Sequence, residues 1–244
     1  MLRILRSGAS ASFAQGPFKI RRIRPGAIFG PDNDQAFGPF SVMDHANLDV
    51  GTVVRMHEHR NDEILSYMWR GKMVHEDSTG QAVSIGPRRL MMMNAGKSFW
   101  HEESTPDVPV EMLQIFIRPR NSDLPGQVQF FDRPDDSASG SWILIAAAEG
   151  EGAPLSIRQD VTVYDAHLRV GESIKIPHVE GLSQWLYVMD GEISIGGDSL
   201  QKGDAVTDFD DALPPVEAKM PTGLVLFLVN RNATASLLGT ISGR

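Results

Sequence analysis

The chain has no cysteine among its 244 residues. This absence excludes a disulfide scaffold, a thiolate metal site and a cysteine nucleophile, and it fits a cytoplasmic protein. No apolar run approaches the roughly 20 residues with which a helix crosses a bilayer. The chain has few basic residues for its number of acidic ones: 31 acidic residues outnumber 23 basic ones, and the net charge is −8. We therefore expect neither a membrane nor a nucleic acid as a partner.

Long stretches with helical spacing are scarce as well. The chain instead shows short apolar or alternating runs that end at glycine, proline, aspartate or asparagine, a pattern typical of β-strands. An N-terminal strand is expected over Phe18–Ile23, since the basic segment around it lacks the apolar core of a cleavable leader. The pattern predicts an all-β sandwich or barrel, with strands at Val53–Met56, Ile64–Trp69, Ala82–Ile85, Leu90–Met93, Glu111–Ile117, Ser141–Ala147, Val161–Val170, Leu182–Met189 and Gly223–Val229.

A weak internal repeat divides the sequence. Three pairs of residues share an offset of 120 positions, which is close to half the chain length: Gly51 and Gly171, Tyr67 and Tyr187, Gly71 and Gly191. Such self-similarity predicts two tandem copies of one β unit. The polar, turn-rich segment 132–140 is the predicted linker. The predicted units are then residues 1–131 and 141–244.

The first unit contains two closely spaced pairs of metal-ligand residues, His57 with His59 and His101 with Glu103. Residues two apart on a strand point to the same face of a sheet. Two such strands would direct three imidazoles and one carboxylate to one point, a ligand set suited to a divalent transition metal. The same offset of 120 places Pro177 at the position of His57, so only the first unit is predicted to bind metal.

These residues resemble the first signature of the cupin superfamily and, more closely, the pirin family. The resemblance covers roughly residues 20–130. In the pirin pattern a proline often separates the first two histidines and a Gly-Phe pair follows the arginine, whereas this chain has Glu58 and Asn61-Asp62. These departures leave the substrate open. The matching motifs are His57-Glu-His59-Arg60, His75-Glu-Asp77-Ser78, Ala95-Gly96 and His101-Glu-Glu103.

The resemblance implies a bicupin, that is, two tandem jelly-roll β-barrels, with one mononuclear metal centre in the first. The implied ligands are His57, His59, His101 and Glu103. Fe(II) is the family's usual metal, and the ligand types also allow zinc, manganese, nickel and copper. Glu63 competes with Glu103 for the carboxylate role. If Glu103 is the ligand, as we favour, Glu63 is the candidate to hydrogen-bond the other nitrogen of a ligand histidine.

Two functions follow from the resemblance. The first is an oxidoreductase that cleaves a flavonol or related phenolic with dioxygen, as a quercetin 2,3-dioxygenase does, with Glu103 as the base that takes the phenolic proton. The second is a regulatory protein without turnover, whose metal redox state changes its affinity for a protein partner. The enzyme is favoured because no apolar interaction surface stands out in the sequence. His75 is expected to be a hydrogen-bonded polar residue rather than a ligand.

Overall fold

The computed structural model describes residues 1–30, 34–134, 139–209 and 211–244. Almost all of its regular structure is β-strand, so the all-β prediction is confirmed. Two 3-10 helices, η1 (Ser7–Ala9) and η2 (Pro25–Phe29), are the helical elements of the described residues. Within those same residues, no helix has the length and apolar character needed to span a membrane.

Each run predicted as a strand coincides with an observed strand, to within one to three residues at the ends. The strands of the first half are β1 (Arg3–Leu5), β2 (Ala11–Gln15), β3 (Phe18–Ile23), β4 (Phe40–Leu48), β5 (Val53–His59), β6 (Glu63–Arg70), β7 (Met73–Asp77), β8 (Ala82–Ile85), β9 (Arg89–Asn94), β10 (Phe99–Ser104), β11 (Val110–Ile117) and β12 (Gln127–Asp132). Those of the second half are β13 (Trp142–Ala148), β14 (Leu155–Ile157), β15 (Val161–Leu168), β16 (Ser173–Ile174), β17 (Ser183–Asp190), β18 (Glu192–Ile195), β19 (Asp198–Gln201), β20 (Ala205–Thr207), β21 (Val216–Ala218) and β22 (Thr222–Val229).

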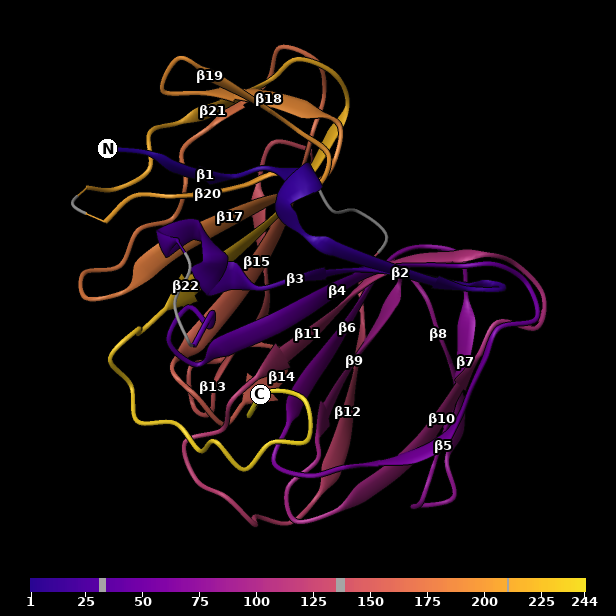
Figure 1. Ribbon diagram of the computed structural model, residues 1–244. Coiled ribbons are helices and arrows are strands. Elements are labelled where there is room, and N and C mark those ends of the chain that lie inside the picture. The colour runs from indigo at the N-terminus through magenta and orange to yellow at the C-terminus, as the bar shows by residue number, and fades with distance from the viewer. Residues whose placement is uncertain (31–33, 135–138, 210) are drawn as a thin grey trace.

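The strands form two seven-stranded and two four-stranded sheets (Figure 1). In the first unit the orders are β12-β9-β6-β11-β4-β3-β2 and β5-β10-β7-β8. In the second they are β1-β20-β17-β22-β15-β13-β14 and β16-β21-β18-β19. The four-stranded sheets and the five inner strands of the seven-stranded sheets have the same spatial order in both units. The edge strands differ, since β14 pairs parallel with β13 whereas β2 pairs antiparallel with β3. The predicted repeat is thus a real duplication of one cupin-like unit.

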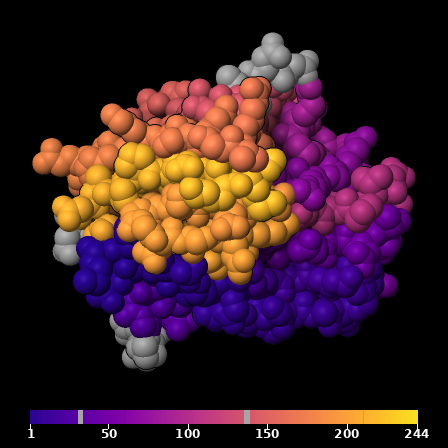
Figure 2. Space-filling model, turned by 90° about the horizontal axis from the view of Figure 1, so that it is seen from above, coloured from indigo at the N-terminus to yellow at the C-terminus, as the bar shows by residue number. Residues whose placement is uncertain are grey.

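The first strand of the chain lies in the sheet of the second unit. β1 pairs antiparallel with β20, and Arg3 is opposite Thr207. Figure 2 shows this indigo N-terminal segment directly against the orange residues of the second unit. The predicted linker falls between the end of β12 and the start of β13, and its residues 135–138 lie outside the described residues. The division into residues 1–131 and 141–244 therefore stays a proposal.

Alternation along β11 shows how the sequence separates two apolar regions. Leu113 and Ile115 belong to the large core that also contains Trp185 and Phe227 of the second unit. Phe116 faces the opposite way, into the interior of the first unit. Strand side chains alternate in this manner, and full burial of each large apolar side chain contributes about 1.5–3 kcal/mol. The core between the seven-stranded sheets therefore holds the two units together.

Candidate metal centre

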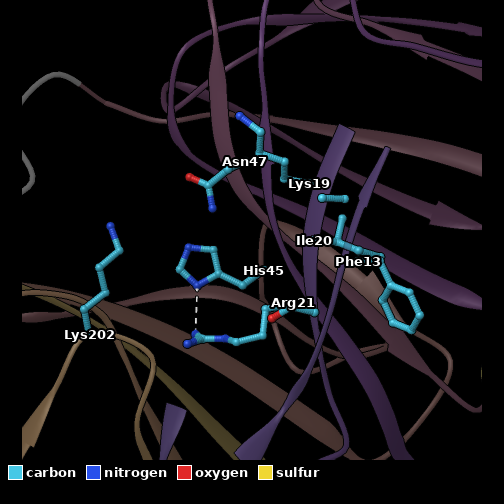
Figure 3. A pocket seen from close by; sticks show the side chains of 9 residues that line it. Phe13, Lys19, Ile20, Arg21, His45, Asn47 and Lys202 are labelled. Atoms are coloured by element: carbon cyan, nitrogen blue, oxygen red, sulfur yellow. Dashed lines mark hydrogen bonds between the residues drawn. The ribbon is translucent and has the colours of Figure 1, made fainter. Parts of the chain in front are cut away.

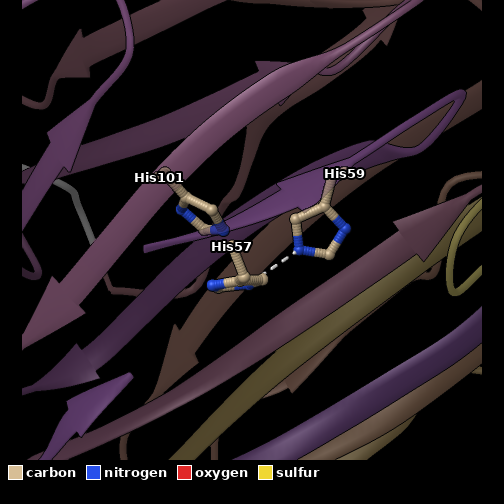
Figure 4. A group of neighbouring side chains, drawn as sticks. All are labelled: His57, His59 and His101. Atoms are coloured by element: carbon tan, nitrogen blue, oxygen red, sulfur yellow. Dashed lines mark hydrogen bonds between the residues drawn. The ribbon is translucent and has the colours of Figure 1, made fainter. Parts of the chain in front are cut away.

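Three histidines converge on one side of the first unit's four-stranded sheet. β5 and β10 pair antiparallel with His57 opposite His101 and His59 opposite Phe99. The ring centroids of His57 and His101 are 4.5 Å apart, those of His57 and His59 are 4.9 Å apart, and those of His59 and His101 are 5.2 Å apart. Figure 4 shows the three rings facing a common point. Pairing across two strands thus brings together residues separated by more than forty positions.

The hydrogen bonds of His57 and His59 fix which ring nitrogens are free. Nδ1 of His57 lies 2.8 Å from the carbonyl oxygen of Arg55, and Nδ1 of His59 lies 2.8 Å from the Asp62 carboxylate. A carbonyl or carboxylate oxygen only accepts, so both Nδ1 atoms must donate. Each neutral ring then directs the lone pair of its Nε2 at the other histidine.

The two Nε2 atoms are 3.1 Å apart. That contact is a hydrogen bond only when one ring is doubly protonated, and otherwise two lone pairs face each other. Two nitrogen ligands bound at right angles to one ion, with bonds of about 2.1 Å, lie about 3 Å apart. The observed separation of these atoms in His57 and His59 therefore fits neighbouring ligands of a divalent ion.

His101 supplies a third free imidazole. It is 1% exposed, and neither of its ring nitrogens has a hydrogen-bond partner. Burial, with smaller contributions from His59 and His57, lowers the pKa of His101 to about 2. The ring is therefore neutral, and its unpartnered buried nitrogens cost free energy unless another group binds them.

Glu103 lies close to the histidines but belongs to a second, overlapping group. A β-bulge separates it from His101 on β10. Its Oε1 is 3.9 Å from Nδ1 of His101, and Gln114 donates to its carboxylate at 3.1 Å. Burial raises the pKa of Glu103 to about 7. Ligand atoms of His57, His59 and His101 lie within 4.8 Å of one another, and those of His101, Glu103 and His75 form a second such group.

His75 belongs to the second group of possible metal-binding side chains, together with His101 and Glu103, which the sequence did not indicate. It is fully buried on β7, opposite Glu103 of β10. Its Nε2 hydrogen-bonds Asp77 at 3.0 Å, while its Nδ1 has no partner. His75 was expected to be a hydrogen-bonded polar residue, and the hydrogen bond is present at Nε2 but not at Nδ1. The available signal was the His75-x-Asp77 spacing, which on a strand places both side chains on one face.

Glu63 does not contact a histidine. Its carboxylate accepts hydrogen bonds from Nδ2 of Asn94 at 2.5 Å and from the backbone N–H of Arg158 at 2.9 Å. Burial raises the pKa of Glu63 to about 7 despite these bonds. The carboxylate that hydrogen-bonds Nδ1 of His59 is that of Asp62, the neighbour of Glu63.

Asp62 connects His59 to the last residues of the chain. It is fully buried, and its Oδ1 accepts from the backbone N–H of Ser242 at 2.9 Å and from the Ser242 hydroxyl at 2.7 Å. Asn61 supplies the turn before it with a φ of 49°, a left-handed conformation that asparagine tolerates better than most residues. This contact could not be predicted from a local motif, because 180 positions separate the two partners.

A cavity of about 180 Å³ opens beside the cluster. Polar groups of His57, His59, Glu103 and Gln114 line one part of it. Ile241 and Thr240 close it from the C-terminal segment, which Figure 1 shows in yellow crossing the first unit. The remaining lining is mostly apolar and includes Phe18, Ile20, Ala46, Leu48, Met112 and Phe116. A few polar groups in an apolar pocket are typical of a small-molecule site.

Two family models match the chain. One, described as Pirin, covers residues 18–117, and the other, described as the quercetinase C-terminal cupin domain, covers residues 144–229. The duplicated β fold with its histidine cluster therefore defines a two-unit cupin. The chain belongs to the pirin family, and the resemblance seen in its motifs is confirmed.

Individual relatives are more distant. A Zymomonas mobilis protein provisionally named quercetin 2,3-dioxygenase is 28% identical over 200 residues, which cover 81% of this chain and 85% of that protein. The quercetin 2,3-dioxygenase of Escherichia coli K12 is 23% identical over 197 residues, which cover 80% of this chain and 84% of its own. The crystal structure of the Escherichia coli pirin YhhW in complex with nickel(II) matches with a TM-score of 0.83 at 19% identity, covering 94% of this chain and 99% of that one. At that identity the match shows the fold.

Proposed function

We propose that this pirin binds one divalent metal ion on His57, His59 and His101, with Glu103 as the fourth ligand. The observation that carries the proposal is the trio of buried or half-buried imidazoles whose ligand atoms lie within 4.8 Å of one another. The Nε2 atoms of His57 and His59 face each other, and both nitrogens of His101 lack a partner among the described residues. The nickel(II) complex of the Escherichia coli pirin supports it by analogy. Fe(II) is our proposed native metal, and the nitrogen and oxygen ligands also suit zinc, manganese, nickel and copper.

The proposed reaction is dioxygenase cleavage of a flavonol or a related small phenolic. The bound metal would supply Lewis acidity toward the phenolic oxygen and would activate dioxygen. Glu103, whose side chain lines the cavity, would take the phenolic proton as general base. Gln114 donates to the Glu103 carboxylate at 3.1 Å and thereby orients it toward the cavity. The names of the relatives from Zymomonas mobilis and Escherichia coli support this class of substrate.

The size of the cavity narrows the substrate class. Pockets for drug-sized ligands usually measure about 300–1,000 Å³, whereas this cavity has about 180 Å³. A one-ring phenolic fits this volume more easily than a three-ring flavonol. A flavonol would need Thr240 and Ile241, which form one wall, to move outward.

Turnover of phenolics by the metal-loaded protein tests the proposal. The protein is stripped with a chelator, reloaded with Fe(II) or nickel(II), and given quercetin or catechol under oxygen. We expect metal-dependent oxygen uptake, with loss of the substrate's absorbance, and no uptake by the Glu103→Gln variant. Glu180→Gln, in an exposed loop of the second unit, serves as the folded control. If the protein binds metal but takes up no oxygen with any phenolic, the proposed dioxygenase activity is wrong and only the proposed metal site stands.

A second candidate function has one observation in its favour. Met56 and Trp100, which alternate with the histidines on β5 and β10, are 46% and 44% exposed on the outer face of the sheet. An exposed apolar pair beside a redox-active metal could bind a protein partner according to the metal's charge. The test is capture of a defined partner by the ferrous but not the ferric protein, with loss of capture in Trp100→Ala and no oxygen uptake on phenolics.

A further inference from the structure

A second cavity lies away from the histidine cluster, where the two units meet. It is an open cleft of about 450 Å³, formed by β2, β3 and β4 of the first unit and by Lys202 of the second. Figure 3 shows Lys202, Arg21 and Asn47 arranged around His45, with Phe13 and Ile20 on the other side. Three cationic side chains line the cleft, those of Lys19, Arg21 and Lys202, and its lining among the described residues includes no carboxylate.

An ordered chain of hydrogen bonds runs beneath the cleft. Arg21 donates to the hydroxyl of Tyr187 at 2.5 Å, and that hydroxyl lies 2.7 Å from Nδ1 of His45. Nε2 of His45 lies 2.9 Å from the Glu111 carboxylate, so Nε2 carries the hydrogen and Nδ1 accepts from Tyr187. Burial lowers the pKa of His45, which is therefore neutral. Glu111 also pairs with Lys202, and despite its burial these bonds lower the pKa of Glu111 to about 2.

The charge of Arg21 is not balanced by this chain. Lys202 pairs with Glu111 and Asp190, and Lys19 pairs with Asp49 at 2.7 Å. Arg21 makes no ion pair within the described parts of the chain; its partners are a hydroxyl and a neutral imidazole, and its Nε has none. Its guanidinium packs so closely on Gly203 that a Cβ there would lie 2.3 Å from it. Arg21 is half-buried, so its guanidinium is only partly hydrated, and a bound anion would supply the counter-charge that it lacks among the described residues.

The internal repeat provides a built-in comparison for this feature. At the offset of 120, Tyr67 corresponds to Tyr187, and Asp165 corresponds to His45. Tyr67 donates to Asp165 at 2.7 Å, and Arg133 pairs with the same carboxylate at 2.8 Å. In that copy the arginine is therefore neutralised from within the protein. In the copy with His45, the place of the carboxylate is taken by a neutral ring.

We infer that this cleft binds a small organic anion, with its carboxylate or phosphate group on Arg21 and Lys202. Asn47 is exposed and makes no side-chain hydrogen bond of its own, so its amide supplies a further donor. Phe13, which is 53% exposed on the edge strand β2, forms the apolar side of the cleft and packs against the organic part of the ligand. Planar guanidinium groups suit both carboxylate and phosphate. The shared chemistry is an anionic oxygen group next to an apolar body.

Calorimetric titration of four probes tests this inference: benzoate, phenyl phosphate, inorganic phosphate and neutral benzyl alcohol. The titrations use the metal-free His57→Ala protein beside the wild type, so that binding at the histidine cluster is recognised. We expect one equivalent of benzoate or phenyl phosphate to bind both proteins and benzyl alcohol to bind neither. Binding of benzoate alone assigns a carboxylate ligand, and binding of phenyl phosphate or inorganic phosphate alone assigns a phosphate ligand.

Matched variants locate the bound anion. Arg21→Gln and Lys202→Met should each weaken binding at least tenfold. Lys219→Met removes the same charge from a lysine of similar exposure outside the cleft, 44% against 41% for Lys202, and should leave binding unchanged. If Arg21→Gln does not fold, as judged by circular dichroism, Lys202→Met and the exposed Asn47→Leu carry the test. The inference is wrong if neither organic anion binds the wild type, if binding is lost in His57→Ala, or if Lys219→Met weakens it as much as Lys202→Met.

Discussion

The interiors of the two units differ although the order of their inner strands is the same. Between its two sheets the first unit encloses a cavity lined by His57, His59 and the buried Glu103, with His101 in the adjoining histidine cluster. The second unit fills the corresponding space with apolar side chains, among them Ile174, Ile193, Leu186, Leu226 and Val216. A cupin unit is therefore stable with or without a polar site. The comparison shows that the site is an addition to one strand pair and is not required for the fold.

The strand that carries the first two histidines is where the units diverge. β5 runs for seven residues and ends at His59, whereas β16, its counterpart, has two residues. Pro177 stands where the repeat would place His57. Proline has no backbone N–H to donate to a strand ladder, so the pairing does not continue through this position. The second unit thus lacks both the ligands and the extended strand that would orient them.

The largest expected effect is the loss of metal from the first unit alone. His101→Ala should reduce the metal content of the purified protein to background, because it removes the most buried of the three imidazoles. His178→Ala, at an exposed histidine of the second unit, should leave the metal content unchanged. Elemental analysis after dialysis measures both. Equal metal in the wild type and in His101→Ala would show that the ion binds elsewhere.

The next largest effect is expected at Asp62, whose carboxylate accepts a hydrogen bond from Nδ1 of His59. Asp62→Asn replaces an acceptor-only carboxylate with an amide whose NH₂ group must face either His59 or Ser242. Loss of such a supporting hydrogen bond typically costs about 10–100-fold in metal affinity. Competition with a fluorescent chelator measures the dissociation constant. Glu180→Gln, in an exposed loop of the second unit, is the control, and no change in affinity for Asp62→Asn at an unaltered Tm would exclude the positioning role.

A pH-dependent effect on stability is expected at Glu63, whose place in the repeat is taken by the uncharged Ser183. The pKa of Glu63 is raised from 4.5 to about 7 by burial, so the neutral form is favoured in the folded state. Its contribution to stability is complete below pH 4.5 and is lost as the pH rises to about 7. Glu63→Gln should therefore raise the Tm at pH 8 by a few degrees, about 2–4 °C for each kcal/mol, and change it little at pH 4.5. Thermal unfolding at the two pH values gives the difference, and an equal shift at both would contradict it.

The smallest effect separates the two tyrosines that the repeat makes equivalent. Tyr67 donates to the carboxylate of Asp165, whereas Tyr187 donates to the neutral ring of His45 and also accepts from the Arg21 guanidinium. Hydrogen bonds to charged groups contribute about 1.5–3 kcal/mol, and neutral ones about 1 kcal/mol. Tyr67→Phe should therefore lower the free energy of unfolding by about 2 kcal/mol and Tyr187→Phe by about 3 kcal/mol, measured by urea denaturation. A larger loss for Tyr67→Phe would show that the bond from Arg21 to Tyr187 adds little stability.

The strand pattern and the histidine cluster were predictable because both depend on local spacing. Alternation places side chains on one face of a strand, and His57, His59 and His101 could be assigned to one site on that basis together with the family resemblance. The supporting contacts were not predictable. Asp62 with Ser242 and Tyr187 with His45 join residues 180 and 142 positions apart, and no short motif encodes such pairs. For His75 the spacing signal was present, but burial decides its importance and burial depends on the assembled sheet.

The contact between Asp62 and the C-terminal segment sets an order of events during synthesis. Ser242, which donates to the buried carboxylate beside His59, is translated 180 residues after Asp62. The first unit's sheets can pair while the ribosome is still producing the second. The full set of bonds that orients His59 forms only after the chain as far as Ser242 has emerged, so stable metal binding should follow the synthesis of the second unit.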